Sequence, residues 1–273
     1  MSYFLSEIFV YPIKSLGGIA LQKALVTDRG LQYDRRWMLI DSQNRFKTQR
    51  QHPQMALLQV SITGNGLEIF HKTKKINPLF VPFEPENPEK KQVQIWDDIC
   101  QALTVSRLAD EWFSEVLQEK CQLVFMPDES RLLVDTRYAT HQEITSLSDG
   151  YPFLIIGQAS LDFLNNKLTH QLPINRFRPN LVFTGGTPHE EDNWQEFTMQ
   201  NINFFGVKPC ARCVVTTIDQ ATGLGGKEPL ATLNSYRKKG NKILFGQNLL
   251  HQNTGFVQVG DQIFVSKRSP VEP

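Results

Sequence analysis

The feature that most restricts the fold of this chain is a series of short segments of alternating polarity, separated by residues that favour turns. In the first hundred residues these segments are LSEIFVYPI, RRWMLID, RFKTQ and ALLQVSITG. Residues 41–44 (DSQN) and 64–66 (GNG) between them favour tight hairpin turns. Period-two alternation is typical of strands with one buried face. We therefore predict antiparallel β structure joined by hairpins.

Three segments have helical periodicity instead. They are RLADEWFSEVLQE at 107–119, SLDFLNNKL, and EPLATLNSYRK, which begins with an acid and a proline and ends in basic residues. Further strands are predicted in CQLVFMP, FLIIG, RFRPNLVFTG, NINFFGV, CVVTTID, KILFGQN and GFVQVGDQIFV. Four prolines among glutamates in 78–88 predict a surface loop. Many strands and few helices favour a mainly β (α+β) fold with two β-barrel-like domains and a few peripheral helices.

Composition excludes several classes of protein. With 273 residues, of which 40% are hydrophobic, the chain can bury a core and is not disordered. Twenty-nine Lys and Arg against 28 Asp and Glu leave a net charge of +1, which gives no global attraction to nucleic acid or anionic lipid. Four scattered cysteines are too few for a disulfide scaffold. Because no signal peptide and no apolar run of membrane-spanning length is apparent, we expect a cytoplasmic protein without a membrane span.

Two N-terminal segments could bind an anion locally. Lys14 and Ser15 precede two glycines at the end of the first predicted strand, which suits a small anion cradle. The alternative is a strand that leaves into a loop, with Lys14 in solvent. At the start of the next strand, Arg35 and Arg36 should point to opposite faces, so that at most one points inward. A buried arginine needs a phosphate or carboxylate partner, and Asp34 could be that partner.

A third basic segment is RFRPN at 176–180. Pro179 should force Arg178 into an extended conformation, in which Arg176, Arg178 and Asn180 share one face. Donor-rich side chains in this arrangement suit an anion with several acceptor oxygens. The alternative is an exposed edge strand with solvated arginines.

Cys210 and Cys213 form a CxxC pair in PCARC. Such a pair can be a redox dithiol, half of a zinc site, a source of one thiolate for a soft metal, or two structural cysteines. No second CxxC supplies further zinc ligands, and a β-branched segment rather than a helix follows. We expect Pro209 to make a turn and Cys213 to begin a strand, where its side chain could face a cleft.

The remaining residues with potential chemistry are less specific. Asp149 stands before the apolar run YPFLII and is either a turn residue or a site acid. The six histidines show no metal-binding spacing. The sequence contains no P-loop, dinucleotide fingerprint or nucleophile elbow.

Taken in order, the segments YPIKS, DRRWMLID, TQRQHPQMAL, RFRPNLVF, EDNW, KPCARCVVTTID, EPLATL and LFGQN resemble the MOSC family. The resemblance spans nearly the whole chain and is strongest with the amidoxime-reducing MOSC proteins. It implies a MOSC N-terminal β-barrel domain at 1–125 and a MOSC domain at 126–273, with a molybdenum cofactor (molybdopterin) held between them. Pyridoxal phosphate is associated with the family only through the cofactor sulfurases, whose partner domain uses it.

The resemblance also implies roles for particular residues. Cys213 would bind the metal, and Asp149 takes the position of an active-site acid. Contacts to the phosphate and pterin carry over to a larger set, namely Lys14, Ser15, Arg35, Arg178, Asn180, Ala211, Arg212 and Asn248. Relatives have a serine where this chain has Ala211, so only the backbone N–H of Ala211 could still make that contact. They have a tyrosine where this chain has Asn248.

The function implied is reduction of N-hydroxylated compounds, such as amidoximes and N-hydroxylated bases, by a molybdenum-dependent oxidoreductase. The chain has no cysteine cluster for a fused iron–sulfur domain, so we expect electrons from a separate donor protein of the ferredoxin, flavodoxin or cytochrome type. The alternative is a carrier of the cofactor or of sulfur that has no turnover of its own.

Overall fold

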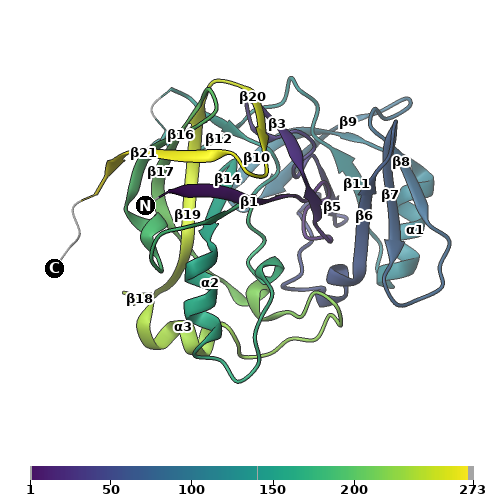
Figure 1. Ribbon diagram of the computed structural model, residues 1–273. Coiled ribbons are helices and arrows are strands. Elements are labelled where there is room, and N and C mark those ends of the chain that lie inside the picture. Colours follow the sequence, from purple (N-terminus) through teal and green to yellow (C-terminus); the bar gives the residue numbers. More distant parts are fainter. Residues whose placement is uncertain (1, 140, 270–273) are drawn as a thin grey trace.

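The computed structural model describes residues 2–139 and 141–269 and shows a mainly β protein with few helices, as predicted (Figure 1). The helices are α1 (Arg107–Leu117), α2 (Gln158–Asn165) and α3 (Leu230–Tyr236), with 3₁₀ turns η1 (Pro53–Leu57), η2 (Ile174–Arg176), η3 (Glu190–Asn193) and η4 (Val214–Thr217). Within the described residues, no helix is both long enough and apolar enough to cross a bilayer.

Seven strands close into a barrel in the order β14, β15, β1, β21, β16, β17, β19 and back to β14. Their bounds are β1 (Tyr3–Val10), β14 (Phe153–Gly157), β15 (Leu181–Thr184), β16 (Trp194–Met199), β17 (Ile202–Ala211), β19 (Lys242–Gln252) and β21 (Gln262–Arg268). Among these seven described strands, only β14 and β15 pair in parallel. The interior holds a cluster of large aromatic and aliphatic side chains that includes Trp194, Phe197 and Phe204.

The first strand of the chain is part of this barrel, although the rest of the barrel follows residue 150. β1 pairs with β15 and β21, and it also carries the short β2 (Ile19–Leu21). A three-stranded sheet of β20 (Gly255–Gln258), β3 (Lys23–Thr27) and β4 (Gly30–Leu31) makes a second link between the chain's ends. The two halves of the sequence are therefore interleaved, and the predicted boundary near residue 125 stays a prediction.

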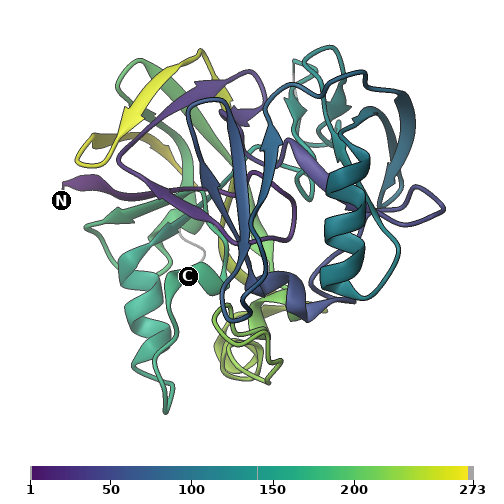
Figure 2. The same cartoon turned by 90° about the vertical axis from the view of Figure 1, so that its right-hand side faces the viewer.

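The N-terminal half packs beside the barrel as two further sheets (Figure 2). One is ordered β5 (Trp37–Ile40), β11 (Gln122–Phe125), β10 (Asp98–Thr104), β9 (Lys90–Ile95). The other is ordered β6 (Leu58–Ile62), β7 (Gly66–His71), β8 (Leu79–Pro82). Two small strand pairs complete the list, β12 (Leu132–Leu133) with β13 (Ile144–Thr145), and β18 (Lys238–Lys239) with β19. The sheets share a core with α1 around Trp37, Phe113 and Leu123.

Helix α1 begins and ends where local chemistry requires. Ser106 is its N-cap, and the Ser106 hydroxyl accepts a hydrogen bond from the Ala109 N–H at 3.2 Å. Gln118 ends the helix in the left-handed conformation, with a φ of 55°. The apolar stripe read from the sequence packs Phe113 and Val116 into the core and confirms the predicted helix.

Three local predictions were wrong. Part of the proline-rich segment 78–88 is not a loop, because β8 pairs with β7 at a sheet edge, the position in which prolines are tolerated. Pro209 does not make a turn, since β17 continues through it to Ala211 with a register shift that accommodates the missing N–H. The segment after Cys213 is the 3₁₀ turn η4 rather than a strand.

Glu191 gives the fold a testable dependence on pH. Its side chain is completely buried, and the carboxylate accepts hydrogen bonds from the Ser160 hydroxyl and the Gly157 N–H, with no cationic partner in the part of the chain that the structure describes. Burial, with repulsion from Asp192, raises the pKa of Glu191 from 4.5 to about 7. Because the folded-state pKa is the higher one, protonation stabilises the fold fully below pH 4.5, and this contribution is lost as the pH rises to about 7.

We expect Glu191→Gln to raise the free energy of unfolding at pH 8 by roughly 2–3 kcal/mol and to leave it nearly unchanged at pH 5. Urea unfolding at both pH values measures this difference. An equal effect of the substitution at pH 5 and pH 8 would contradict the assignment.

Candidate functional site

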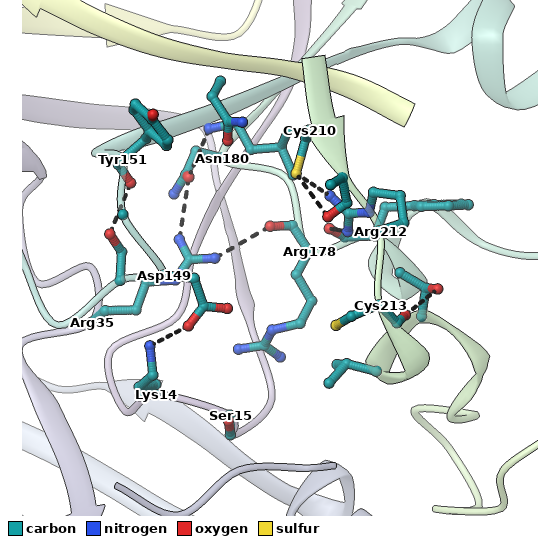
Figure 3. A pocket seen from close by; sticks show the side chains of 18 of the residues that line it. Lys14, Ser15, Arg35, Asp149, Tyr151, Arg178, Asn180, Cys210, Arg212 and Cys213 are labelled. Carbon is teal, nitrogen blue, oxygen red and sulfur yellow. Dashed lines mark hydrogen bonds and ion pairs between the residues drawn. The ribbon is translucent and has the colours of Figure 1, made fainter. Parts of the chain in front are cut away.

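One pocket of about 440 Å³ brings together every residue selected from the sequence (Figure 3). Both halves of the chain contribute to its walls. The predicted residues that line it are Lys14, Ser15, Arg35, Asp149, Arg178, Asn180, Ala211, Arg212, Cys213 and Asn248. This volume is within the range of small-molecule sites.

The pocket is built from segments at strand ends. Lys14 and Ser15 follow β1, Arg35 precedes β5, and Asp149 precedes β14. Residues 176–180 connect η2 to β15, and residues 210–213 end β17. Asn248 lies within β19 beside this end of β17. The rigid barrel and the N-terminal sheets therefore fix the positions of loops that carry the polar groups.

Two arginines are stacked on one buried tyrosine. The guanidinium of Arg35 lies 4.4 Å and that of Arg178 lies 4.2 Å from the centre of the Tyr11 ring. Tyr11 is held in turn by its hydroxyl, which donates to the Pro179 carbonyl at 3.0 Å. Burial lowers the pKa of Arg178 to about 10, and the neighbouring Arg35 adds repulsion. Two buried cations this close together repel each other, so this part of the pocket favours the binding of an anion that contacts both guanidiniums.

Each arginine also has a specific anchor. Arg35 donates to Asp34 at 2.6 Å, so the predicted carboxylate partner is present, and also to the Asn180 side chain at 3.2 Å. Arg178 donates to the Leu16 carbonyl at 2.6 Å. These bonds use only some of the N–H groups of each guanidinium, which leaves donors for a ligand.

The predicted backbone of both segments was wrong in detail. Arg35 has a φ of 48° and lies before β5 rather than in it, and Arg36 is also largely buried, with its guanidinium donating to the Met126 carbonyl and to Asp128. Arg178 is not extended but has a φ of 53°. Pro179 excludes the right-handed helical region, and the bond to Leu16 holds Arg178 in the left-handed one.

Lys14 and Asp149 form an ion pair inside the pocket. Lys14 Nζ donates to Asp149 Oδ1 at 2.6 Å and to the Leu147 carbonyl at 2.8 Å. The lysine side chain is only 6% exposed, whereas the aspartate side chain is 66% exposed and faces the open space. The Asp149 carboxylate is enclosed by the pocket walls although it faces open space, and this enclosure would raise its pKa, but the Lys14 ammonium overcomes the effect and holds that pKa well below its usual range. Asp149 is therefore a carboxylate at neutral pH and accepts hydrogen bonds.

The two cysteines of the CxxC pair differ in their surroundings. Cys210 accepts a hydrogen bond on sulfur from Arg212 Nη1 at 3.0 Å. The Cys213 sulfur points into the pocket on the side that faces Arg178 (Figure 3). Cys213 precedes η4, and its carbonyl accepts from the Thr216 hydroxyl at 2.9 Å and from the Thr216 N–H at 3.1 Å. This turn fixes the direction of the Cys213 side chain in place of the predicted strand.

Some predicted residues support the walls. The Asn180 amide accepts from Leu154 N–H at 3.3 Å and donates to the Phe9 carbonyl at 3.3 Å, so it ties β1 to β14. The Asn248 amide donates to the Lys208 carbonyl at 3.3 Å. Arg212 packs over the Phe177 ring at 5.6 Å. Ala211 ends β17 and is exposed at the pocket.

Several lining residues were not selected from the sequence, and four of them have large polar, charged or aromatic side chains. They are Arg50, Trp96, Tyr151 and Lys208. Trp96 stands in a two-residue turn between two strands of alternating polarity, and its place at the tip of a hairpin is the sequence signal that could have identified it. Lys208 lies 4.5 and 5.0 Å from the rings of Tyr138 and Tyr151.

The charge of the pocket is strongly unbalanced. Seven lysine and arginine side chains line it against the single carboxylate of Asp149. Arg176 is 7% exposed, and its Nε and Nη1 have no hydrogen-bond partner among the described residues. Within 2–139 and 141–269, no group of three or more His, Cys, Asp or Glu side chains could hold a metal ion. The pocket thus suits an anion, and a metal there would have to bring most of its own ligands.

Comparison with known proteins gives matches over most of the chain. Residues 2–120 match the MOSC N-terminal beta barrel domain and residues 142–264 match the MOSC domain. The chain is 31% identical to mitochondrial amidoxime-reducing component 1 of Mus musculus, over 95% of this chain and 81% of that protein. It is 29% identical to molybdenum cofactor sulfurase of Oryza sativa subsp. japonica, over 96% of this chain but only 35% of the sulfurase. A solved structure, the YUAD protein from Bacillus subtilis, is 8% identical with a TM-score of 0.41, over 96% of this chain and 94% of that one.

Proposed function

The chain belongs to the MOSC family, and from this membership and the chemistry of the pocket we propose that it is a molybdenum-cofactor-dependent reductase of N-hydroxylated compounds. The relatives that match along most of their own length are named amidoxime-reducing components. The sulfurase relatives match over about a third of their length, so the rest of a sulfurase has no counterpart in the alignment.

The residues of the pocket fit the cofactor. A phosphomonoester carries about −1.5 to −2 charges near neutral pH, and the Arg35 and Arg178 guanidiniums on Tyr11 are the buried cations that would bind it, although Arg35 already shares the Asp34 carboxylate. Ser15, with a φ of 68°, lines the same end. Arg176 and Arg212 also line the pocket, and a guanidinium is a donor of the kind that the polar edges of a pterin would need. The Cys213 sulfur is the soft ligand expected for molybdenum.

The reaction is a two-electron reduction of an N–O bond. An amidoxime, two electrons and two protons give an amidine and water, and the bound cofactor supplies the redox centre that takes the oxygen. Electrons come from a separate donor protein. The protein itself orients the substrate and compensates charge.

Asp149 is the residue that would orient the substrate. Its carboxylate is ionised and exposed to the pocket, so it accepts hydrogen bonds from the N–H groups of an amidoxime or amidine. Lys14 Nζ lies 2.6 Å from Asp149 Oδ1, and this ion pair keeps the Asp149 carboxylate ionised and in position. Since Asp149 stays ionised, it is a hydrogen-bond acceptor rather than a proton donor, and water is left to deliver the protons.

The observation that carries the proposal is the convergence of one soft thiol, several buried arginines with N–H groups left for a ligand, and one exposed carboxylate in a single pocket. Protein expressed in a host that makes the cofactor, and given a reduced viologen as electron source, is expected to convert benzamidoxime to benzamidine. Chromatographic detection of benzamidine measures the conversion. A preparation that contains molybdenum and pterin but forms no benzamidine would contradict the reductase and favour a carrier.

A further inference from the structure

Trp96 is an unusual residue for the position that it occupies. It lies between β9 and β10, where Ile95 pairs with Asp98 and leaves a two-residue turn, Trp96 and Asp97. Its φ is 55°, in the left-handed region that such turns normally fill with Asn, Asp or Gly. A bulky aromatic in this conformation stores strain, and strain of this kind is concentrated at functional sites.

The Trp96 ring is part of the pocket wall and touches its single carboxylate. It is 40% exposed, and its Nε1–H donates to Asp149 Oδ1 at 3.3 Å. The Phe46 ring meets Trp96 edge to face at 4.8 Å, which fixes the ring plane. The N-terminal half thus delivers a flat aromatic surface to the residue that we propose orients the substrate.

A planar cation already lies on that surface. The guanidinium carbon of Arg50 is 4.3 Å from the centre of the Trp96 ring. Arg50 lines the same pocket and has no carboxylate within ion-pair distance among the described residues. A guanidinium is a flat N–C–N group of the same shape as an amidine, so Arg50 shows what the ring face accepts.

We propose that Trp96 is a specificity-determining residue, whose ring face binds the planar conjugated group of the substrate in the place that the Arg50 guanidinium occupies. In an aryl amidoxime or amidine the ring is conjugated with the flat N–C–N head, so an aryl ring stacked there would place the N–H groups of the head beside the Asp149 carboxylate, which can accept them. Aromatic amidoximes and amidines would therefore be preferred over those with a saturated ring. The identity of the ligand as an amidoxime rests on the proposed function.

The test compares two amidines that need no reduction to bind. Benzamidine is planar and conjugated, and cyclohexanecarboxamidine has the same head on a saturated ring, so the ratio of their dissociation constants isolates stacking. Calorimetry on the cofactor-loaded protein gives both constants. Trp96→Asn, which suits the left-handed turn and should fold, is expected to reduce the preference for benzamidine by about tenfold. Trp96→Phe is expected to retain most of the preference.

Arg50→Gln should have the opposite effect, because it removes the competitor from the ring. We expect the preference for benzamidine to rise about twofold to fivefold in this variant. Trp112→Phe is the matched control, since Trp112 lies in α1 and donates to the Asn77 carbonyl instead of lining the pocket. The preference should not change in it.

An unchanged preference in Trp96→Asn, or an equal fall in Trp112→Phe, would overturn the stacking site. This failure is distinct from failure of the proposed function. If wild-type protein reduces benzamidoxime while Trp96→Asn keeps its preference, only the proposed stacking site is contradicted. If the preference changes as expected while benzamidoxime is not reduced, the pocket binds amidines, and the proposed reductase activity is contradicted.

Discussion

Replacing Cys213 with serine is expected to remove both bound molybdenum and reductase activity. A serine hydroxyl has nearly the same size, but it is not the soft thiolate that molybdenum prefers. Cys213 is the cysteine whose sulfur points into the pocket, and no cluster of metal-binding side chains within the described residues could replace it. Metal content by mass spectrometry and benzamidoxime turnover should both fall to less than about 1% of wild type, a loss of roughly 3 kcal/mol or more.

Cys210→Ser is the matched control. The Cys210 sulfur accepts a hydrogen bond from Arg212 at 3.0 Å, which a serine hydroxyl can also accept. We expect this variant to keep its molybdenum and most of its activity. Full metal content in Cys213→Ser, or loss of metal in Cys210→Ser only, would show that the ligand was assigned to the wrong cysteine.

Asp149→Asn is expected to lower kcat/KM for benzamidoxime by about 100-fold, or about 2.7 kcal/mol, while molybdenum content stays at the wild-type level. The amide keeps the shape of the side chain but removes the charge that Lys14 and Trp96 hold in place. Lys14 stays anchored to the Leu147 carbonyl at 2.8 Å, so the pocket should persist. Steady-state kinetics and metal analysis on the same preparation separate the two effects.

Asp128→Asn is the control for Asp149→Asn, because it removes a carboxylate charge outside the pocket. Asp128 pairs with Arg36 at 2.8 Å, and its side chain is exposed outside the pocket. Its substitution should leave kcat/KM within about twofold of wild type, because exposed ion pairs contribute little. Equal kinetics for Asp149→Asn and wild type would remove Asp149 from the proposed mechanism.

The sequence predicted the secondary structure class well because alternation is a local signal. The helix at 107–119 appears at nearly the expected position because its apolar spacing identifies the buried face, and the strand FLIIG does so because a short continuous apolar run indicates a strand buried on both faces. The closed barrel depends on pairings between distant segments, such as β1 with β15 and β21. Alternation contains no information about such partners, so the order of strands could not be predicted.

Lys14, Arg35 and Cys213 were selected from short motifs, and they line one pocket, but their roles in it stay predictions. The backbone of the segments that carry them was predicted less well. The extended conformation expected for Arg178 was wrong because a tertiary hydrogen bond to Leu16 overrides the local preference set by Pro179.

Trp96 was missed for a related reason. Its neighbours QVQI and DICQ indicate a hairpin, but the pattern does not reveal which pocket the hairpin tip reaches. The contact with Asp149 joins residues 53 positions apart in the sequence. Only the packing of the N-terminal sheets beside the barrel brings them together.

An anomalous difference map, recorded at the molybdenum absorption edge on crystals of cofactor-loaded protein, shows directly which atom binds the metal. We expect one strong peak at bonding distance from Cys213 Sγ, inside the pocket that holds Asp149. A molybdenum peak bound at another site, with none beside Cys213, would contradict it.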